Sequence, residues 1–207
     1  MNPKRIIGII DYGVGNLASV VHALRAVGYR CCVSRDRDEL AESDLLLLPG
    51  VGAFPQAMDA LHRLNLVQFI QNQAYANKPI VGICLGMHLL SESSTEITFT
   101  AGLNLIPGKV ESLRIARWHI GWNSLEVVMN HPIFRKYDSE PLYFNHSYVF
   151  HAPKEYLVAV SRLENISEPI PIVVSRKNVV GLQFHPEKSQ LIGQQLLADV
   201  IEGLFDA

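Results

Sequence analysis

The sequence is poor in cysteine and in net charge, and each shortage excludes a class of protein. Only three cysteines occur in 207 residues, and Cys31 and Cys32 are adjacent, so neither a disulfide framework nor a zinc or other metal site is expected. Eighteen Lys and Arg against 20 Asp and Glu give a net charge of -2. That balance provides no electrostatic attraction to nucleic acid or to an anionic membrane.

Long apolar runs are also missing. No stretch approaches the roughly 18 apolar residues of a membrane span. The N-terminal run from Arg5 to Ile10 is interrupted by Asp11 too soon for a secretory signal. We therefore expect a cytoplasmic protein that does not contact a membrane.

Apolar residues are nevertheless abundant, at 48% of the chain against 18% charged, which is enough for one substantial core. The length predicts a single domain over residues 1–207. In the first half, apolar runs bounded by turn residues alternate with segments of helical spacing, which predicts an α/β fold with an open, mostly parallel sheet flanked by helices. Strands are expected at 6–10, 45–48, 80–83 and 179–184, and helices at 17–27, 64–76 and 191–205.

Between residues 102 and 180 the helical spacing gives way to short β-rich pieces separated by turns. We interpret this region as an antiparallel β extension of the main sheet. Its expected strands lie at 106–113, 124–128, 142–150, 156–161 and 172–174.

Cys84 is the first candidate for chemistry, because it lies in the segment Gly82-Ile83-Cys84-Leu85-Gly86 between a predicted strand and a helical pattern. Such a sharp turn flanked by glycines is a nucleophile elbow. The glycines leave room for neighbouring backbone, and a helix N-terminus favours the thiolate over the thiol. A buried cysteine at the end of a core strand would give the same short pattern.

A histidine and a carboxylate near the C-terminus supply what a thiol nucleophile needs. Pro186 forces His185 into an extended conformation, so His185 and Glu187 are expected to point to the same side. The histidine can take the thiol proton and later protonate the leaving group, while the carboxylate fixes its tautomer. Without Cys84, a solvated strand end would be the favoured explanation of His185 and Glu187.

A glycine-bracketed loop at the end of a neighbouring strand, Gly50-Val51-Gly52, is a candidate oxyanion site. Attack on a carbonyl builds negative charge on its oxygen, and two backbone donors suffice to stabilise it: the Leu85 amide and one from this loop. The glycines would also let the Val51 peptide reorient. A tight strand-to-helix loop with no catalytic role remains the alternative.

Six ordered blocks of sequence resemble the class I glutamine amidotransferases, and among them the glutaminase subunits of imidazole glycerol phosphate synthase. The resemblance covers nearly the whole chain, and its blocks are residues 11–17, 49–54, 82–87, 120–123, 146–148 and 183–190. It implies a flavodoxin-like fold, a catalytic triad of Cys84, His185 and Glu187, and no cofactor.

The resemblance also implies an activity and a partner. Glutamine would form a γ-glutamyl thioester on Cys84, and water would then release glutamate. The ammonia would pass to a (β/α)₈ cyclase subunit, in a heterodimer, for synthesis of imidazole glycerol phosphate and aminoimidazole carboxamide ribotide. The implied oxyanion and substrate-binding residues are Gly50, Val51, Gly52, Leu85, His88, His146, Ser147 and Tyr148, and the implied interface residues are Asn16, Trp122, Tyr143 and Lys188.

Three positions depart from the family pattern. His88 stands where glutamine is usual, Trp118 where proline is usual, and Asn145 where the family tends to be apolar. These departures leave open a paralogous glutaminase that supplies a different synthase, such as one modifying an amino-sugar. An autonomous cysteine hydrolase and a non-catalytic interaction subunit are further alternatives. The sequence blocks that contain Trp122 and Lys188 disfavour the autonomous hydrolase.

Overall fold

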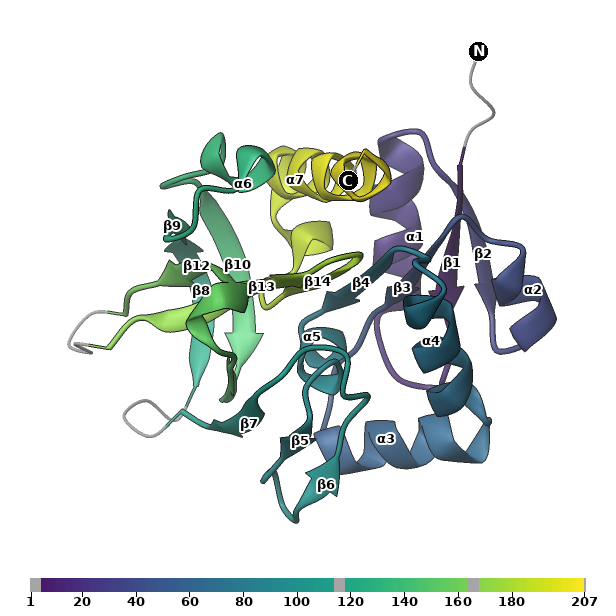
Figure 1. The fold of residues 1–207 in the computed structure, drawn as a ribbon. Helices are drawn as coiled ribbons and strands as arrows, with labels where there is room; N and C mark the ends of the chain where they lie inside the picture. The colour runs from purple at the N-terminus through teal and green to yellow at the C-terminus, as the bar shows by residue number, and fades with distance from the viewer. Residues whose placement is uncertain (1–4, 114–117, 164–167, 207) are drawn as a thin grey trace.

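The structure is a computed structural model that describes residues 5–113, 118–163 and 168–206. An eight-stranded sheet in the order β2-β1-β3-β4-β14-β13-β12-β9 forms its centre (Figure 1). The five strands from β2 to β14 run parallel and the other three pair antiparallel, which confirms the expected α/β fold with an antiparallel extension. Their bounds are β1 Ile6–Ile10, β2 Arg30–Ser34, β3 Leu45–Leu48, β4 Ile80–Ile83, β9 Glu126–Val127, β12 Leu157–Ser161, β13 Ile170–Arg176 and β14 Val179–Leu182.

Helices cover both faces of the parallel strands, as Figure 1 shows. Because both faces are covered, β3 is leucine at every position and all four side chains are fully buried. Each contributes roughly 2 kcal/mol of hydrophobic stabilisation. The helices are α1 Leu17–Ala26, α2 Arg37–Ala41, α3 Phe54–Arg63, α4 Leu66–Tyr75, α5 Leu85–Leu89, α6 Pro132–Arg135 and α7 Gln190–Phe205, with short 3-10 helices η1 Lys154–Tyr156 and η2 Pro186–Lys188.

Alternate residues of the parallel strands enter two separate cores. Leu45 and Leu47 pack in the core beneath α1 and α7, whereas Leu46 and Leu48 pack in the core beneath α3, α4 and α5. This alternation follows from the period of two in a strand. No helix in the described ranges is long and apolar enough to cross a membrane.

Two smaller sheets accompany the main sheet. β8 (His119–Ser124) and β10 (Pro141–His146) pair antiparallel, and we call them the β8–β10 ribbon. After Ser147 the chain continues as β11 (Tyr148–His151), which joins β7 (Lys109–Ser112), β5 (Ser93–Ser94) and β6 (Thr100–Ala101) in a four-stranded sheet. One continuous segment from 141 to 151 therefore links both small sheets.

Several elements were not predicted from the sequence, among them β2, α2, β5, β6 and α6, and two more of them lie close to the site. The whole of α3 lies where no helix was predicted, and its N-cap, Ala53, makes no side-chain capping hydrogen bond that would mark the start. The apolar spacing of Phe54, Ala57, Met58 and Leu61 would have revealed it. β8 was also not predicted, because Gly121 and Asn123 interrupt its β-rich composition.

Candidate active site

Cys84 lies in the turn between β4 and α5 with a backbone conformation that side chains rarely adopt, φ 53° and ψ -110°. Such a conformation costs on the order of 1–3 kcal/mol and persists only where packing enforces it. Here Gly86 enforces it by close approach, since a Cβ on Gly86 would lie 1.8 Å from the Leu48 carbonyl oxygen. The turn therefore holds the thiol at the carboxyl edge of the parallel sheet, where ligands bind in folds of this kind.

His185 and Glu187 reach the same edge from the neighbouring strand. β14 pairs parallel with β4, and the Cys84 amide donates to the Leu182 carbonyl at 2.7 Å, which joins the two backbones. His185 Nδ1 lies 2.7 Å from Glu187 Oε1, and both side chains are almost fully buried. The structure thus places the histidine and its carboxylate side by side, next to the cysteine turn.

The electrostatics of His185 suit proton transfer. Burial lowers the pKa of His185, but the nearby Cys84 sulfur and the hydrogen bond to Glu187 outweigh burial and raise that pKa to about 9. His185 Nε2 and Glu187 Oε2 are buried and have no hydrogen-bond partner within the described part of the chain. An imidazolium at this position can stabilise a thiolate and can also donate a proton to a leaving group.

A small cavity of about 180 Å³ opens beside Cys84. Seven of the eight residues expected at the oxyanion and substrate sites line it: Val51, Gly52, Leu85, His88, His146, Ser147 and Tyr148. Gly50 lies behind the lining, where a Cβ would come within 2.6 Å of the Tyr12 hydroxyl and 2.9 Å of Leu85 Cβ. Tyr12 also donates to the Pro49 carbonyl at 2.6 Å and so holds this loop against the cysteine turn.

Three residues at the site were not among those predicted. Glu96 and Asn145 line the cavity, and the buried Gln183 side chain lies 4.0 Å from Cys84 Sγ through its Nε2. Burial raises the pKa of Glu96, and a hydrogen bond from the Phe54 amide at 2.8 Å opposes that rise. No local motif marks Glu96, whereas Gln183 could have been found because it lies two positions before His185 on the same side of an extended segment.

Buried histidines form a chain of hydrogen bonds through the β8–β10 ribbon. His119 Nδ1 lies 3.0 Å from His146 Nε2, and His146 Nδ1 lies 2.8 Å from the Tyr148 carbonyl oxygen. A carbonyl only accepts, so His146 donates from Nδ1 and accepts from His119. Burial lowers the pKa of His146 to about 3 and that of His119 and His88 to about 4, which keeps all three rings neutral at pH 7.

Three of the four residues expected at an interface cluster on the outer side of this ribbon. Trp122 and Tyr143 are cross-strand partners with ring centroids 6.0 Å apart, and Lys188 Nζ lies 5.8 Å from the Tyr143 ring. Asn16 instead caps α1, where its Oδ1 accepts from the Ser19 amide at 3.4 Å. Trp118 is 58% exposed and directly precedes the ribbon.

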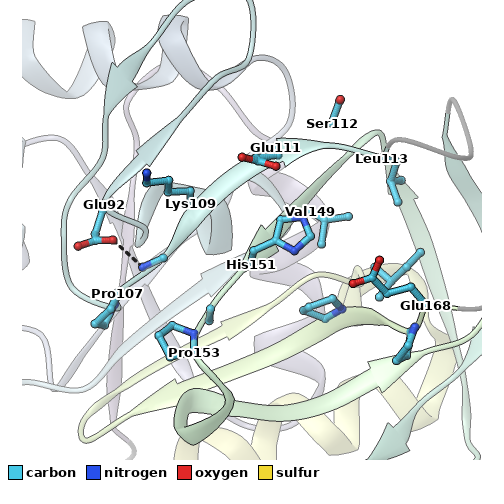
Figure 2. Close-up of a pocket in the computed structure, with 15 residues that line it drawn as sticks. Glu92, Pro107, Lys109, Glu111, Ser112, Leu113, Val149, His151, Pro153 and Glu168 are labelled. Atoms are coloured by element: carbon cyan, nitrogen blue, oxygen red, sulfur yellow. Dashed lines mark hydrogen bonds between the residues drawn. The ribbon is translucent and has the colours of Figure 1, made fainter.

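A larger cavity of about 640 Å³ lies elsewhere, beside β7 and β11 (Figure 2). Its lining includes Lys109, Glu111, His151 and Glu168, which Figure 2 labels. The Glu92 carboxylate, also in the lining, accepts a hydrogen bond from the Gly108 amide at 2.9 Å. The described residues that line it include no cysteine and none of the predicted site residues. Chemistry rather than size therefore identifies the smaller cavity as the candidate active site.

Comparisons with known proteins identify the family of this chain. The family model described as Glutamine amidotransferase class-I matches residues 8–202, so the chain belongs to the class I glutamine amidotransferases. The relatives named Imidazole glycerol phosphate synthase subunit HisH from Listeria monocytogenes serotype 4a (strain HCC23) and Shouchella clausii (strain KSM-K16) are each 43% identical to it. The matches cover 93% of both chains for the first, and 96% of this chain and 100% of the relative for the second. Within its class, the chain is a member of the HisH family.

Solved structures extend the likeness to the fold. A chain in the structure of PurLQS from Thermotoga maritima has a TM-score of 0.76 to this chain, and the match covers 98% of this chain and 100% of that one. The two are 21% identical, so this likeness concerns the fold alone.

Proposed function

We propose that this chain is the glutaminase subunit of an imidazole glycerol phosphate synthase and supplies ammonia for histidine biosynthesis. The observation that carries the proposal is the position of Cys84, in its strained turn, next to a buried His185 whose Nδ1 lies 2.7 Å from Glu187 Oε1. The HisH names of relatives 43% identical over almost the whole chain support the pathway. Cys84 must remain a reduced thiol for this chemistry, which favours a cytoplasmic location.

In the proposed reaction, the Cys84 thiolate attacks the side-chain carbonyl carbon of glutamine, and the carbonyl oxygen becomes an oxyanion. His185 gives a proton to the amide nitrogen as its bond to carbon breaks, which releases ammonia and leaves a γ-glutamyl thioester. His185 then takes a proton from water as water attacks the thioester, and glutamate leaves with the Cys84 sulfur restored as a thiolate.

The oxyanion would accept hydrogen bonds from the backbone on two sides of the cavity. Neither the Val51 amide nor the Leu85 amide donates a hydrogen bond within the described part of the chain, so both are available. Glycines flank Val51, and Gly52 has φ 110°. We therefore propose that the Val51 peptide turns toward the substrate when a partner binds, which would make hydrolysis depend on that partner.

The outer side of the β8–β10 ribbon is the proposed docking surface for the cyclase, which we expect to be a (β/α)₈ barrel. On β8, Trp122 is 49% exposed and Ile120 is 58% exposed. Their cross-strand partners on β10 are Tyr143 and Asn145, and all four side chains lie on the same side of the ribbon. Half-exposed aromatic residues of this kind anchor protein interfaces. Lys188 would add a charged contact at its rim.

A decisive experiment mixes the purified chain with the cyclase subunit, its ribotide substrate and glutamine, and measures both glutamate and imidazole glycerol phosphate. We expect weak glutamate release from the isolated chain, a rise of at least about tenfold with the cyclase and ribotide, and equal amounts of both products. A tenfold rise corresponds to about 1.4 kcal/mol, which lies within the coupling free energies of about 1–3 kcal/mol that are typical between two binding sites. Cys84→Ala supplies the matched control, because the cyclase should still form the product from added ammonium salt.

The other outcomes separate the remaining functions. Production of glutamate without imidazole glycerol phosphate would point to a different synthase, such as one acting on an amino-sugar. It would also suggest that His88 and Trp118, which differ from the family pattern, belong with that different partner. Full activity without any partner would identify an autonomous hydrolase. Absence of glutamate, together with no labelling of Cys84 by a glutamine-like electrophile, would identify a non-catalytic subunit.

A further inference from the structure

His88 lies one helical turn after the nucleophile, and a backbone hydrogen bond connects the two residues. The His88 amide donates to the Cys84 carbonyl at 3.2 Å, as the first turn of α5 requires. The His88 ring is 4% exposed and borders the cavity beside Cys84. None of the proposed catalytic steps uses this ring, although it is the most conspicuous departure from the family pattern at the site.

The ring of His88 forms a short hydrogen bond with Gln183. His88 Nε2 lies 2.6 Å from Gln183 Oε1, and the Gln183 side chain is fully buried at the end of β14. Gln183 Nε2, at the other end of the same amide, lies 4.0 Å from Cys84 Sγ. The amide therefore connects the histidine ring to the reacting sulfur.

The chemistry of the three groups fixes the direction of both hydrogen bonds. The Cys84 thiol donates its hydrogen to the Asn145 carbonyl at 3.8 Å, and a thiolate has no hydrogen to donate, so in either state the sulfur can only accept from Gln183. The end of the Gln183 amide that faces Cys84 Sγ must therefore be its NH₂ group. The amide oxygen then faces His88 and needs a donor. A neutral imidazole provides one N–H and can place it on Nε2, whereas the opposite amide orientation would bring an oxygen lone pair against the negative sulfur.

We propose that His88 is a positioning residue for glutamine hydrolysis, which donates from Nε2 to Gln183 Oε1 and thereby holds the Gln183 amide N–H toward the Cys84 sulfur. The amide supports the thiolate before attack and again when the thioester breaks. His88 acts through Gln183 rather than by contacting glutamine. The inference rests on the proposed glutaminase function for its kinetic consequence, but the state of the thiolate can be measured without any substrate.

The test measures the pH dependence of Cys84 alkylation by iodoacetamide in the full chain, with Cys31 and Cys32 replaced by serine in every variant. We expect His88→Leu and Gln183→Met each to raise the midpoint of alkylation by about 1 pH unit, the effect of losing one hydrogen bond to a charged group. The double variant should show no larger shift than either single variant, because the two residues act as one unit. His88→Gln, which restores a donor, should return the midpoint toward that of the parent.

His131→Leu is the matched control, because His131 packs against Phe134 at the start of α6 and belongs to no part of the site. Its midpoint should equal that of the parent. Additive shifts in the double variant, or an unchanged midpoint in His88→Leu, would overturn the proposal. If His88→Leu does not fold, His88→Gln in the Gln183→Met background decides, since any further shift there would show that His88 acts without Gln183.

Kinetics with glutamine and the partner provide the second readout. We expect kcat to fall about tenfold in His88→Leu with KM nearly unchanged, because the thiolate rather than the substrate loses a contact. A rise in KM at constant kcat would instead show that His88 binds glutamine, and would overturn the inference. Absence of turnover in the parent chain would count against the proposed function alone, while the alkylation midpoints would still test the connection from His88 to Cys84.

Discussion

The parallel half of the main sheet and the β8–β10 ribbon contribute to the site in opposite ways. The parallel strands β3, β4 and β14 are buried on both faces and position Cys84, His185 and the glycine loop through backbone geometry. The ribbon is buried on one side only, where His119, Phe144 and His146 lie, and exposes Ile120 and Trp122 on the other.

The parallel strands hold the reacting groups in place, whereas the ribbon connects the cavity with the outer surface. The nucleophile is held by contacts that leave no freedom to move, such as the approach of Gly86 to the Leu48 carbonyl. The ribbon, in contrast, contacts the sulfur directly through the Asn145 carbonyl, 3.8 Å from Cys84 Sγ, while its outer side faces solvent. A partner that binds the outer side could thus affect the cavity through a single layer of backbone.

The largest expected effect is the loss of activity in Cys84→Ala. Removal of a covalent nucleophile should lower glutamine hydrolysis by at least about 10⁴-fold, since neither His185 nor the oxyanion donors can form the thioester. Glutamate release in the presence of the cyclase measures it. Cys31→Ser, on the distant strand β2, should stay within twofold of the parent; a comparable loss in both variants would show that thiols matter for folding rather than for catalysis.

The next largest effect tests the rigidity of the parallel half. Gly86→Ala would bring a methyl group against the Leu48 carbonyl, backbone against backbone, and should cost about 3 kcal/mol or more of unfolding free energy. Chemical denaturation measures this cost. Gly28→Ala is the control. Gly28 also has a positive φ, 98°, but no atom lies within 4 Å of the position that an added Cβ would occupy, so only about 1 kcal/mol of backbone strain is expected. Equal costs would mean that the cysteine turn is less tightly packed than described.

The sequence predicts the parallel half better than the ribbon, for a physical reason. Apolar runs and glycine turns are local signals, so β1, β3, β4 and the turn at Cys84 could be placed from short segments. Glu96 reaches the site by a hydrogen bond to Phe54, 42 residues away in sequence, and His119 meets His146 only through the strand register. Such long-range pairings leave no trace in the spacing of neighbouring residues.

A smaller effect tests the outer side of the ribbon. Trp122→Ala should weaken binding of the cyclase about 30-fold, equivalent to about 2 kcal/mol, because a central aromatic anchor is lost. Titration calorimetry with the cyclase measures it. The stability of the isolated chain should change little, since the side chain is already half exposed. Tyr75→Ala, an exposed aromatic on α4, should leave affinity unchanged; equal losses would argue against the ribbon as the docking surface.

The last effect depends on pH and distinguishes the neutral histidines of the ribbon from the charged histidine of the parallel half. His119 and His146 have folded-state pKa values of about 4 and about 3, below the ordinary value of 6.5. Protons therefore bind preferentially to the unfolded chain, and stability should fall as the pH drops below about 6.5 toward 4. In this pH range, each histidine that is protonated in the unfolded chain and neutral in the folded chain lowers the unfolding free energy by about 1.4 kcal/mol per pH unit.

His185 should act in the other direction. Its folded-state pKa is raised to about 9, so its contribution to stability is complete below 6.5 and is lost as the pH rises through 9. Urea unfolding between pH 4.5 and 9.5 should thus show greatest stability near neutral pH. His119→Gln should reduce the slope on the acid side alone, whereas His185→Gln should reduce it on the alkaline side alone. An acid slope that is unchanged in His119→Gln would mean that this ring is protonated in the folded chain, and that the hydrogen-bond directions assigned to the ribbon are wrong.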